Sequence, residues 1–349
     1  MPFVSHGFAV CMVCFLLMTW SPPSGADGPP QSHNARITKP DGTVRGNVLY
    51  YNRVSKAGST TMLALAHKLA SRNGFHYLSA PMRAYHQPDE ADMKLMQSLA
   101  LPVFYANHHE IINPGSPVWR NYKGGVPIFI NILREPVSRY RSAYDYSFDT
   151  VNRSPRMVNR QIAKREAKEA RCNCWDSSKG QPLPFNDCVL LAVENCPSNL
   201  ELFQLGGQAT FKFLLNLEES KYFYSHKRNI KKFCSPHHQS FAYTRAKHHI
   251  DHHYTFVGIS EEMGRSVRHL ERILPQFYSG ASKMYEKYFE HSSRRVTSHA
   301  SDGPTTRVHR LLESNPCNLA EVRIYNYVKK LFYKKVNGAP AGEEFTQLL

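Results

Sequence analysis

Apolar runs alternate with amphipathic stretches from about residue 47 to about residue 336. The runs Val48–Tyr51 and Val126–Leu133 are almost continuously apolar, which is typical of strands buried on both faces of a parallel sheet. Between them, Met62, Leu65, Ala66 and Leu69 recur at i, i+3, i+4 and i+7, the pattern of an amphipathic helix. Strands that alternate with helices predict an α/β fold, with a central parallel sheet flanked by helices and right-handed crossovers.

Shorter patterns predict the remaining elements. Strands are expected at 76–78, 103–106 and 254–259. Helices are expected near 90–99, over 156–171 and over 319–335. A further helix is expected to begin at Pro136, and another to follow residue 260 and end at about Leu274. We expect Ser260, Glu261 and Glu262 to cap the helix that ends near Leu274. Residues 293–310 are predicted to form a basic loop.

The amino-terminal part of the chain differs from the rest. Residues 8–20 are strongly apolar, but they are fewer than the roughly 20 that a spanning helix needs. Residues 1–26 are therefore interpreted as a signal peptide or a short type II membrane anchor, which brings the chain into the secretory pathway. Residues 27–46 are predicted to be a flexible stem, 47–336 the folded domain and 337–349 a tail.

Charge and cysteine content narrow the setting. The chain has 44 lysines and arginines against 28 acidic residues, an excess that indicates a polyanionic partner. Composition alone does not choose between nucleic acid, an anionic membrane and an acidic polysaccharide. Six cysteines follow the apolar segment, and an even number in an oxidising compartment predicts disulfides; they are Cys172, Cys174, Cys188, Cys196, Cys234 and Cys317. Asn152 begins an N-glycosylation sequon.

The turn between the first strand and the first helix predicts an anion site. The first-turn N–H groups of a helix lack intrahelical partners, and the helix dipole favours negative charge there. Gly58 would let the backbone approach the anion, and Lys56 adds a positive charge. The turn is not a Walker A loop, because Lys56 precedes Gly58. The residues expected to contact the anion are Lys56, Ala57, Gly58, Ser59, Thr60 and Thr61.

The segment from Arg53 to Ser59 fits the form R-V-x-K-x-[GA]-S. It resembles the 5′-phosphosulfate loop of the sulfotransferases, and most closely that of the glycosaminoglycan uronyl 2-O-sulfotransferases. The resemblance implies a single P-loop-like sulfotransferase domain that uses 3′-phosphoadenosine 5′-phosphosulfate (PAPS) as donor. The implied reaction is transfer of a sulfuryl group to the 2-OH of a uronic acid in a dermatan, chondroitin or heparan chain, so the expected partner is this polysaccharide and not nucleic acid. The resemblance also implies a Golgi lumenal location, membrane-anchored or secreted after cleavage, and a homotrimer.

The resemblance assigns roles to individual residues. Lys56 would stabilise charge on the leaving 5′-phosphate, and Arg134 with Ser142 would hold the 3′-phosphate. His108, which follows the Phe-Tyr strand, would be the catalytic base, although Ala106 stands where the heparan enzyme has a first histidine. His109 is the alternative base.

Family-like positions also suggest acceptor contacts and a disulfide. Arg53, Arg294 and Arg295 are expected to bind the acceptor, and the basic stretch 156–171 either extends that groove or is a solvated helix. Cys188 and Cys196 have a family-like spacing, whereas the partner of Cys234 is open among Cys172, Cys174 and Cys317. Ala57-Gly58 and the single histidine of Ala106-Asn-His108 look more like the dermatan and chondroitin uronyl enzyme than the heparan one.

Two features of the sequence are open to other interpretations. Residues His248–His253 contain two i, i+4 histidine pairs, a spacing that zinc can use, but neither pair encloses the glutamate of a metalloprotease. They are interpreted as a cationic or polar helix face, and no metal is expected in the site. The other competitor is a non-catalytic, secreted glycosaminoglycan-binding protein that retains the fold. The ordered set of Lys56, His108 and Arg134 argues against it, since charge alone would serve binding.

Overall fold

The computed structural model describes residues 44, 46–79, 96, 98–108, 126–152, 175–176, 181–195, 234–290 and 303–337. All of them belong to one compact unit, Ser32–Leu349. The predicted leader, the basic stretch 156–171 and the tail lie outside these residues, as does nearly all of the helix expected near 90–99. None of the helices in the described part of the chain is long and apolar enough to cross a membrane.

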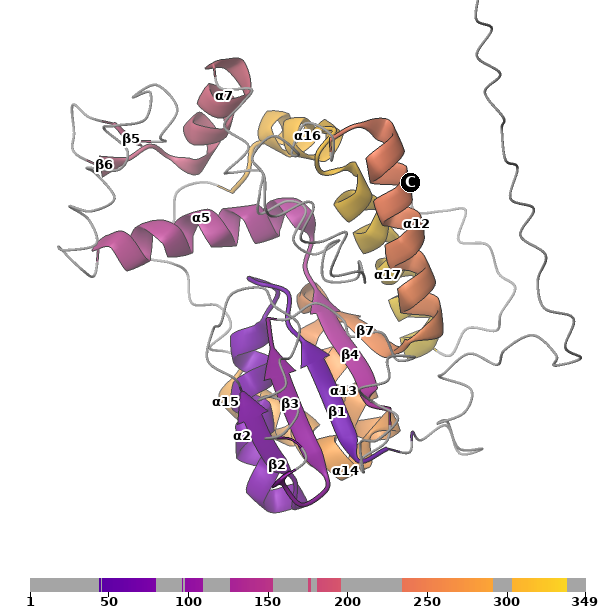
Figure 1. Cartoon of the computed structure of the whole chain (residues 1–349). Coiled ribbons are helices and arrows are strands. Elements are labelled where there is room, and N and C mark those ends of the chain that lie inside the picture. The colour runs from indigo at the N-terminus through magenta and orange to yellow at the C-terminus, as the bar shows by residue number, and fades with distance from the viewer. Residues whose placement is uncertain are drawn as a thin grey trace, which may run out of the picture. The chain divides into compact units, whose positions relative to one another are not determined.

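A five-stranded parallel sheet forms the centre of the unit (Figure 1). In spatial order its strands are β2 (His76–Ser79), β3 (Val103–Asn107), β1 (Val48–Asn52), β4 (Ile128–Leu133) and β7 (Tyr254–Ile259). Every residue of β1, β3 and β4 is buried, as their unbroken apolar runs predicted. The α/β fold with a central parallel sheet is confirmed.

The order of the strands predicts where a ligand binds. From β1 the chain goes outward to β2, returns to β3 beside β1, and then crosses to β4 on the other side of β1. The connection therefore changes direction at β1. In open α/β sheets, ligands bind at such a point, outside the carboxyl ends of the strands.

Helices cover the sheet. The first, α2 (Ser59–Asn73), buries the predicted stripe of Met62, Leu65, Ala66 and Leu69 and packs against α14 (Pro275–Tyr278) and α15 (Ala281–Tyr288). Beside β7, α12 (Pro236–His252) packs against α17 (Leu319–Asn337) (Figure 1). The other elements are α5 (Pro136–Asn152), β5 (Trp175–Asp176), β6 (Gln181–Pro182), α7 (Phe185–Asn195), η3 (Ser260–Glu262), α13 (Met263–Ile273) and α16 (Thr306–Ser314).

Two local predictions were wrong. Ser260 does not cap α13: residues 260–262 form a 3-10 turn, and neither it nor α13 has a side-chain cap. The reason is that Glu261 and Glu262 accept hydrogen bonds from the hydroxyls of Tyr325 and Tyr333 on α17. The loop predicted over 293–310 ends earlier than expected, because α16 begins at Thr306. Thr305 is its N-cap residue and accepts a hydrogen bond from the N–H of Val308.

The structure decides one of the open cysteine pairings. Cys234, just before α12, is bonded to Cys317, just before α17. Cys188 on α7 is buried and disulfide-bonded. Its pairing with Cys196 stays a prediction, because Cys196, like Cys172 and Cys174, lies outside the described residues.

Candidate active site

The loop after β1 has an unusual backbone. Lys56 adopts a φ of 65°, a left-handed conformation that residues with a Cβ rarely take, and such positions cluster at functional sites. Gly58 follows with a φ of 83° and is the N-cap residue of α2. The first turn of α2 carries no acidic residue, and no side chain caps it. The amino end of α2 therefore presents backbone N–H groups that suit an anion.

Arg134 lies at the same edge of the sheet as this loop. It follows β4 directly, and its Nη1 donates a hydrogen bond to the Lys56 carbonyl oxygen, 3.4 Å away. Burial lowers the pKa of Arg134, and the nearby carboxylates of Glu261 and Glu135 oppose that shift. The predicted proximity of Lys56 and Arg134 is thus present in the fold.

The helix that follows Arg134 also faces the loop. The Nζ of Lys56 lies 3.4 Å from the centre of the Tyr146 ring, on α5. Ser142 precedes Tyr146 by one helical turn, so the two share a face of α5. The sequence predicted Ser142 for this site but not Tyr146, because a contact between residues 56 and 146 leaves no local signal.

His108 lies on the other side of the loop, just after β3. Its Nδ1 is 3.1 Å from the carbonyl oxygen of Arg53 and 3.5 Å from the Oγ of Ser55. A protonated Nδ1 can donate to that carbonyl, and this tautomer places the basic lone pair on Nε2. In that tautomer the half-buried ring can accept a proton at Nε2. His109, the alternative base, lies outside the described residues.

Three buried asparagines connect the ends of the strands that carry these residues. Asn131 of β4 donates from Nδ2 to the backbone oxygen of Asn52 on β1, at 2.7 Å. The N–H of Arg53 donates to the backbone oxygen of Asn107 on β3, at 2.8 Å, and the Asn107 Oδ1 accepts from the N–H of His108 at 2.6 Å. Sequence reasoning missed these asparagines, although polar residues within otherwise apolar strands were a visible signal.

A buried ion pair holds α5 in place. The guanidinium of Arg139 donates to Glu321 Oε1 from Nε at 2.8 Å and from Nη2 at 2.5 Å, and both side chains are at most 2% exposed. Tyr140 donates to the other carboxylate oxygen of Glu321 at 3.4 Å. Glu321 is on α17, so this pair connects the helix of Ser142 to the carboxyl-terminal helix.

The remaining predicted residues are less well placed or lie outside the described residues. Arg53 is only 7% exposed, and burial lowers its pKa, so little of its surface is available to a polysaccharide. Arg294 and Arg295 lie outside the described residues. Asn152 is the last residue of α5. The acceptor roles and the glycosylation of these residues stay predictions.

Comparison with known proteins places this geometry in context. A model of the sulfotransferase family matches residues 43–333, which contain the Lys56 loop, His108, Arg134 and Ser142. The chain belongs to the sulfotransferase family. It is 25% identical over 247 residues to the mouse uronyl 2-sulfotransferase, covering 68% of this chain and 50% of that one.

Two invertebrate relatives align with a larger share of this chain, and of their own length, than the mouse enzyme does. The heparin sulfate O-sulfotransferase of Drosophila melanogaster is 26% identical over 261 residues, covering 72% of this chain and 62% of that one. The heparan sulfate 2-O-sulfotransferase of Caenorhabditis elegans is 23% identical over 313 residues, covering 86% and 84%. The chain spans half the length of the mouse and human uronyl enzymes that it matches.

Proposed function

We propose that this protein transfers a sulfuryl group from PAPS to the 2-OH of a uronic acid in a glycosaminoglycan. The observation that carries the proposal is the hydrogen bond from Arg134 to the Lys56 carbonyl, because it brings a second cationic residue to the loop at the amino end of α2. The donor has two phosphate groups that need separate cationic partners. The names of the relatives support the choice of acceptor.

The residues of this chain fit the donor. The backbone N–H groups at the start of α2, from Gly58 to Thr61, would hold the 5′-phosphate. The ammonium of Lys56 would stabilise charge on the bridging oxygen as it leaves. Arg134 and Ser142 would hold the 3′-phosphate, and the Arg139–Glu321 pair would keep their helix in position.

In the transfer, His108 would take the proton of the acceptor hydroxyl at Nε2. The hydroxyl oxygen forms a bond to sulfur while the bond from sulfur to the bridging oxygen breaks, which leaves adenosine 3′,5′-bisphosphate and a sulfate ester. We expect the step to need no metal, since Lys56 and Arg134 supply the positive charge.

The acceptor and the setting are also part of the proposal. Arg53, Arg294 and Arg295 would contact a dermatan, chondroitin or heparan chain, and 156–171 would extend the groove. Binding should then weaken with salt, because a polyanion releases counterions. The proposed location is the Golgi lumen, with residues 1–26 as anchor or cleaved signal, and the proposed assembly is a homotrimer.

The test is sulfation with labelled PAPS and separate heparan and dermatan acceptors, followed by disaccharide analysis. We expect label on the 2-position of uronic acid, and loss of turnover in folded Lys56→Ala and His108→Ala. Lys68→Ala and His67→Ala are matched controls, because both residues are exposed on α2, and each should turn over normally. Tight glycosaminoglycan binding without label transfer would favour the non-catalytic protein. Normal rates in His108→Ala would move the base to His109.

A further inference from the structure

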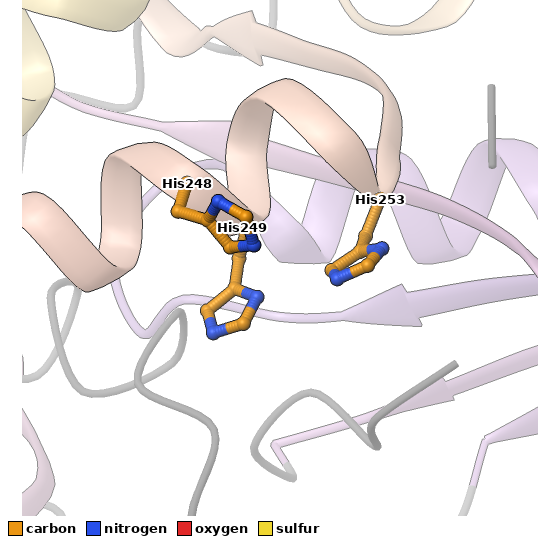
Figure 2. Close-up of side chains that lie close together, drawn as sticks. All are labelled: His248, His249 and His253. Atoms are coloured by element: carbon orange, nitrogen blue, oxygen red, sulfur yellow. The ribbon is translucent and has the colours of Figure 1, made fainter. Parts of the chain in front are cut away.

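Three histidines gather at the carboxyl end of α12. His248, His249 and His253 each offer a ring nitrogen, and the three nitrogens lie within 4.8 Å of one another (Figure 2). The cluster immediately precedes β7, which begins at Tyr254. It therefore lies at the amino edge of the sheet, whereas Lys56 and Arg134 follow the carboxyl ends of β1 and β4 (Figure 1).

His249 is too buried to belong to a polar helix surface. It is only 5% exposed, and both its ring nitrogens are buried without a hydrogen-bond partner among the described residues. Buried polar atoms in native proteins are rarely left unsatisfied, and each such group calls for an explanation. An imidazole nitrogen without a hydrogen-bond partner is available to bind a metal ion.

The backbone already orients the pair His249 and His253. His253 is the C-cap residue of α12, and its N–H donates to the His249 carbonyl at 2.9 Å. Their rings are stacked, with centroids 5.2 Å apart and planes at 22°. The i, i+4 spacing is one that zinc sites use, and the negative end of a helix dipole favours a cation at this terminus.

We propose that His248, His249 and His253 form a binding site for a divalent transition metal, with zinc as the best fit. Three imidazole nitrogens would bind the ion, and the fourth tetrahedral position would take water or another ligand. Zinc–nitrogen bonds of about 2.0–2.1 Å place tetrahedral ligand atoms roughly 3.4 Å apart, so the ring nitrogens need to approach by at most about 1.4 Å. Rotation of exposed His248 and half-buried His253 can supply this.

Asp251, an acidic residue on the same helix, is already engaged. Asp251 pairs with Lys247 at 2.7 Å and also accepts from the hydroxyl of Tyr327, so it is not counted as a ligand. The charge of Arg245 opposes a cation here, and the helix terminus acts in the opposite sense.

The other cluster of potential metal ligands among the described residues is less suitable. It consists of Glu135, His309 and Glu313. Both carboxylate oxygens of Glu135 already accept backbone N–H bonds at the start of α5, at 2.8 and 2.6 Å. The histidine cluster has the buried, unsatisfied ring that this one lacks.

A metal at this edge would stabilise the junction of α12 and β7 and would not take part in sulfuryl transfer. The sequence pattern was interpreted as a polar face; the burial of His249 is the observation that changes this interpretation.

The experiment uses the full chain without a histidine tag, stripped with a chelator that is then removed, and titrated with Co²⁺. A tetrahedral site gives an intense visible absorption that octahedral or adventitious Co²⁺ lacks, and Zn²⁺ should abolish it by displacement. We expect one Co²⁺ per chain, and Zn²⁺ should raise the Tm by several degrees.

Variants make the assignment specific. His253→Gln and His249→Ala should weaken metal binding by at least about tenfold and remove the Tm shift, while His253→Gln keeps normal turnover. His237→Ala, an exposed histidine on the same helix, is the control and should behave as the parent chain. If His249→Ala does not fold, His253→Gln decides alone. Absence of a saturable tetrahedral spectrum, or an unchanged spectrum in His253→Gln, would overturn the proposal.

Discussion

The ammonium of Lys56 rests on the ring face of Tyr146, with Nζ 3.4 Å from the ring centre. The two residues belong to different motifs, the loop after β1 and the helix after β4. Tyr146 is 54% exposed, so its ring is little constrained by the core, and it lies against the Lys56 ammonium. This contact helps to orient the long side chain of Lys56.

Replacing Tyr146 tests that orienting role. A cation–π contact at an exposed site contributes about 0.5–1 kcal/mol, so Tyr146→Ala should lower kcat roughly two- to fivefold. Donor KM should change little, because the charge that Lys56 is proposed to neutralise grows mainly in the transition state. Tyr146→Phe keeps the ring face and should keep the rate. Tyr288→Ala removes a ring 4.9 Å from Lys68 on the far part of α2 and serves as control. Steady-state kinetics that find equal losses in Tyr146→Phe and Tyr146→Ala would contradict the role.

Alanine variants of two glycines at opposite ends of α2 distinguish an effect of backbone strain from an effect on donor binding. Gly58 and Gly74 have φ values of 83° and 69°. A left-handed alanine costs about 1–2 kcal/mol, so Gly74→Ala should lose about this much stability in urea unfolding and Gly58→Ala at least as much. An added Cβ at Gly58 would lie 2.4 Å from the Met263 Cε, whereas the space around Gly74 is open. Only Gly58→Ala should therefore raise donor KM. A similar rise in Gly74→Ala would mean that the effect is general.

The Arg139–Glu321 pair predicts a strongly non-additive double variant. Glu321→Gln leaves a buried guanidinium without its carboxylate and should cost about 3–5 kcal/mol in the free energy of unfolding. Arg139→Met combined with Glu321→Leu should recover most of that loss, because no buried charge remains. Glu286→Gln breaks the pair with Arg268, whose side chains are 55% and 52% exposed, and should change stability little. Denaturant unfolding of the parent chain, Arg139→Met, Glu321→Leu and the double variant gives the coupling energy, with Glu321→Gln and Glu286→Gln measured alongside; simple additivity would be inconsistent with a coupled pair.

His269 predicts a loss of stability in mild acid. It is 8% exposed, stacks on Phe256 and accepts a hydrogen bond from Arg272 at Nδ1. Burial, then the charges of Arg272 and Lys335, lower its pKa from 6.5 to about 4. The unfolded chain therefore takes up a proton near pH 6.5 that the folded chain refuses until about pH 4. Stability contributed by this residue is complete above pH 6.5 and falls as the pH drops toward 4.

The matching variant is His269→Gln, which can still accept from Arg272 but does not titrate. Thermal unfolding between pH 8 and pH 4 should show a smaller fall in Tm for the variant than for the parent chain. Parallel curves would show that His269 does not contribute to the acid sensitivity.

The fold and half of the site could be predicted because their signals are local. The strand, turn and helix from Val48 to Leu69 are encoded by an apolar run, a glycine and a 3.6-residue period within 22 positions. Arg134 could be predicted as a site residue because it directly follows an apolar run, at the end of a strand. Tyr146 and Glu321 could not be found, since each contacts a residue 90 or more positions away and carries no pattern of its own. The cap at Ser260 failed for the same reason, because tyrosines on α17 engage the neighbouring glutamates.

The Cys234–Cys317 bond has a practical consequence for anyone who makes this protein. It closes a span of 83 residues and ends two positions before α17, whose first turn carries Glu321. In the chain-entropy view such a span contributes about 4–5 kcal/mol. A chain produced in a reducing cytosol would lack this tether at the helix that holds α5. Its inactivity would then resemble a catalytic defect, although Lys56, His108 and Arg134 were all intact.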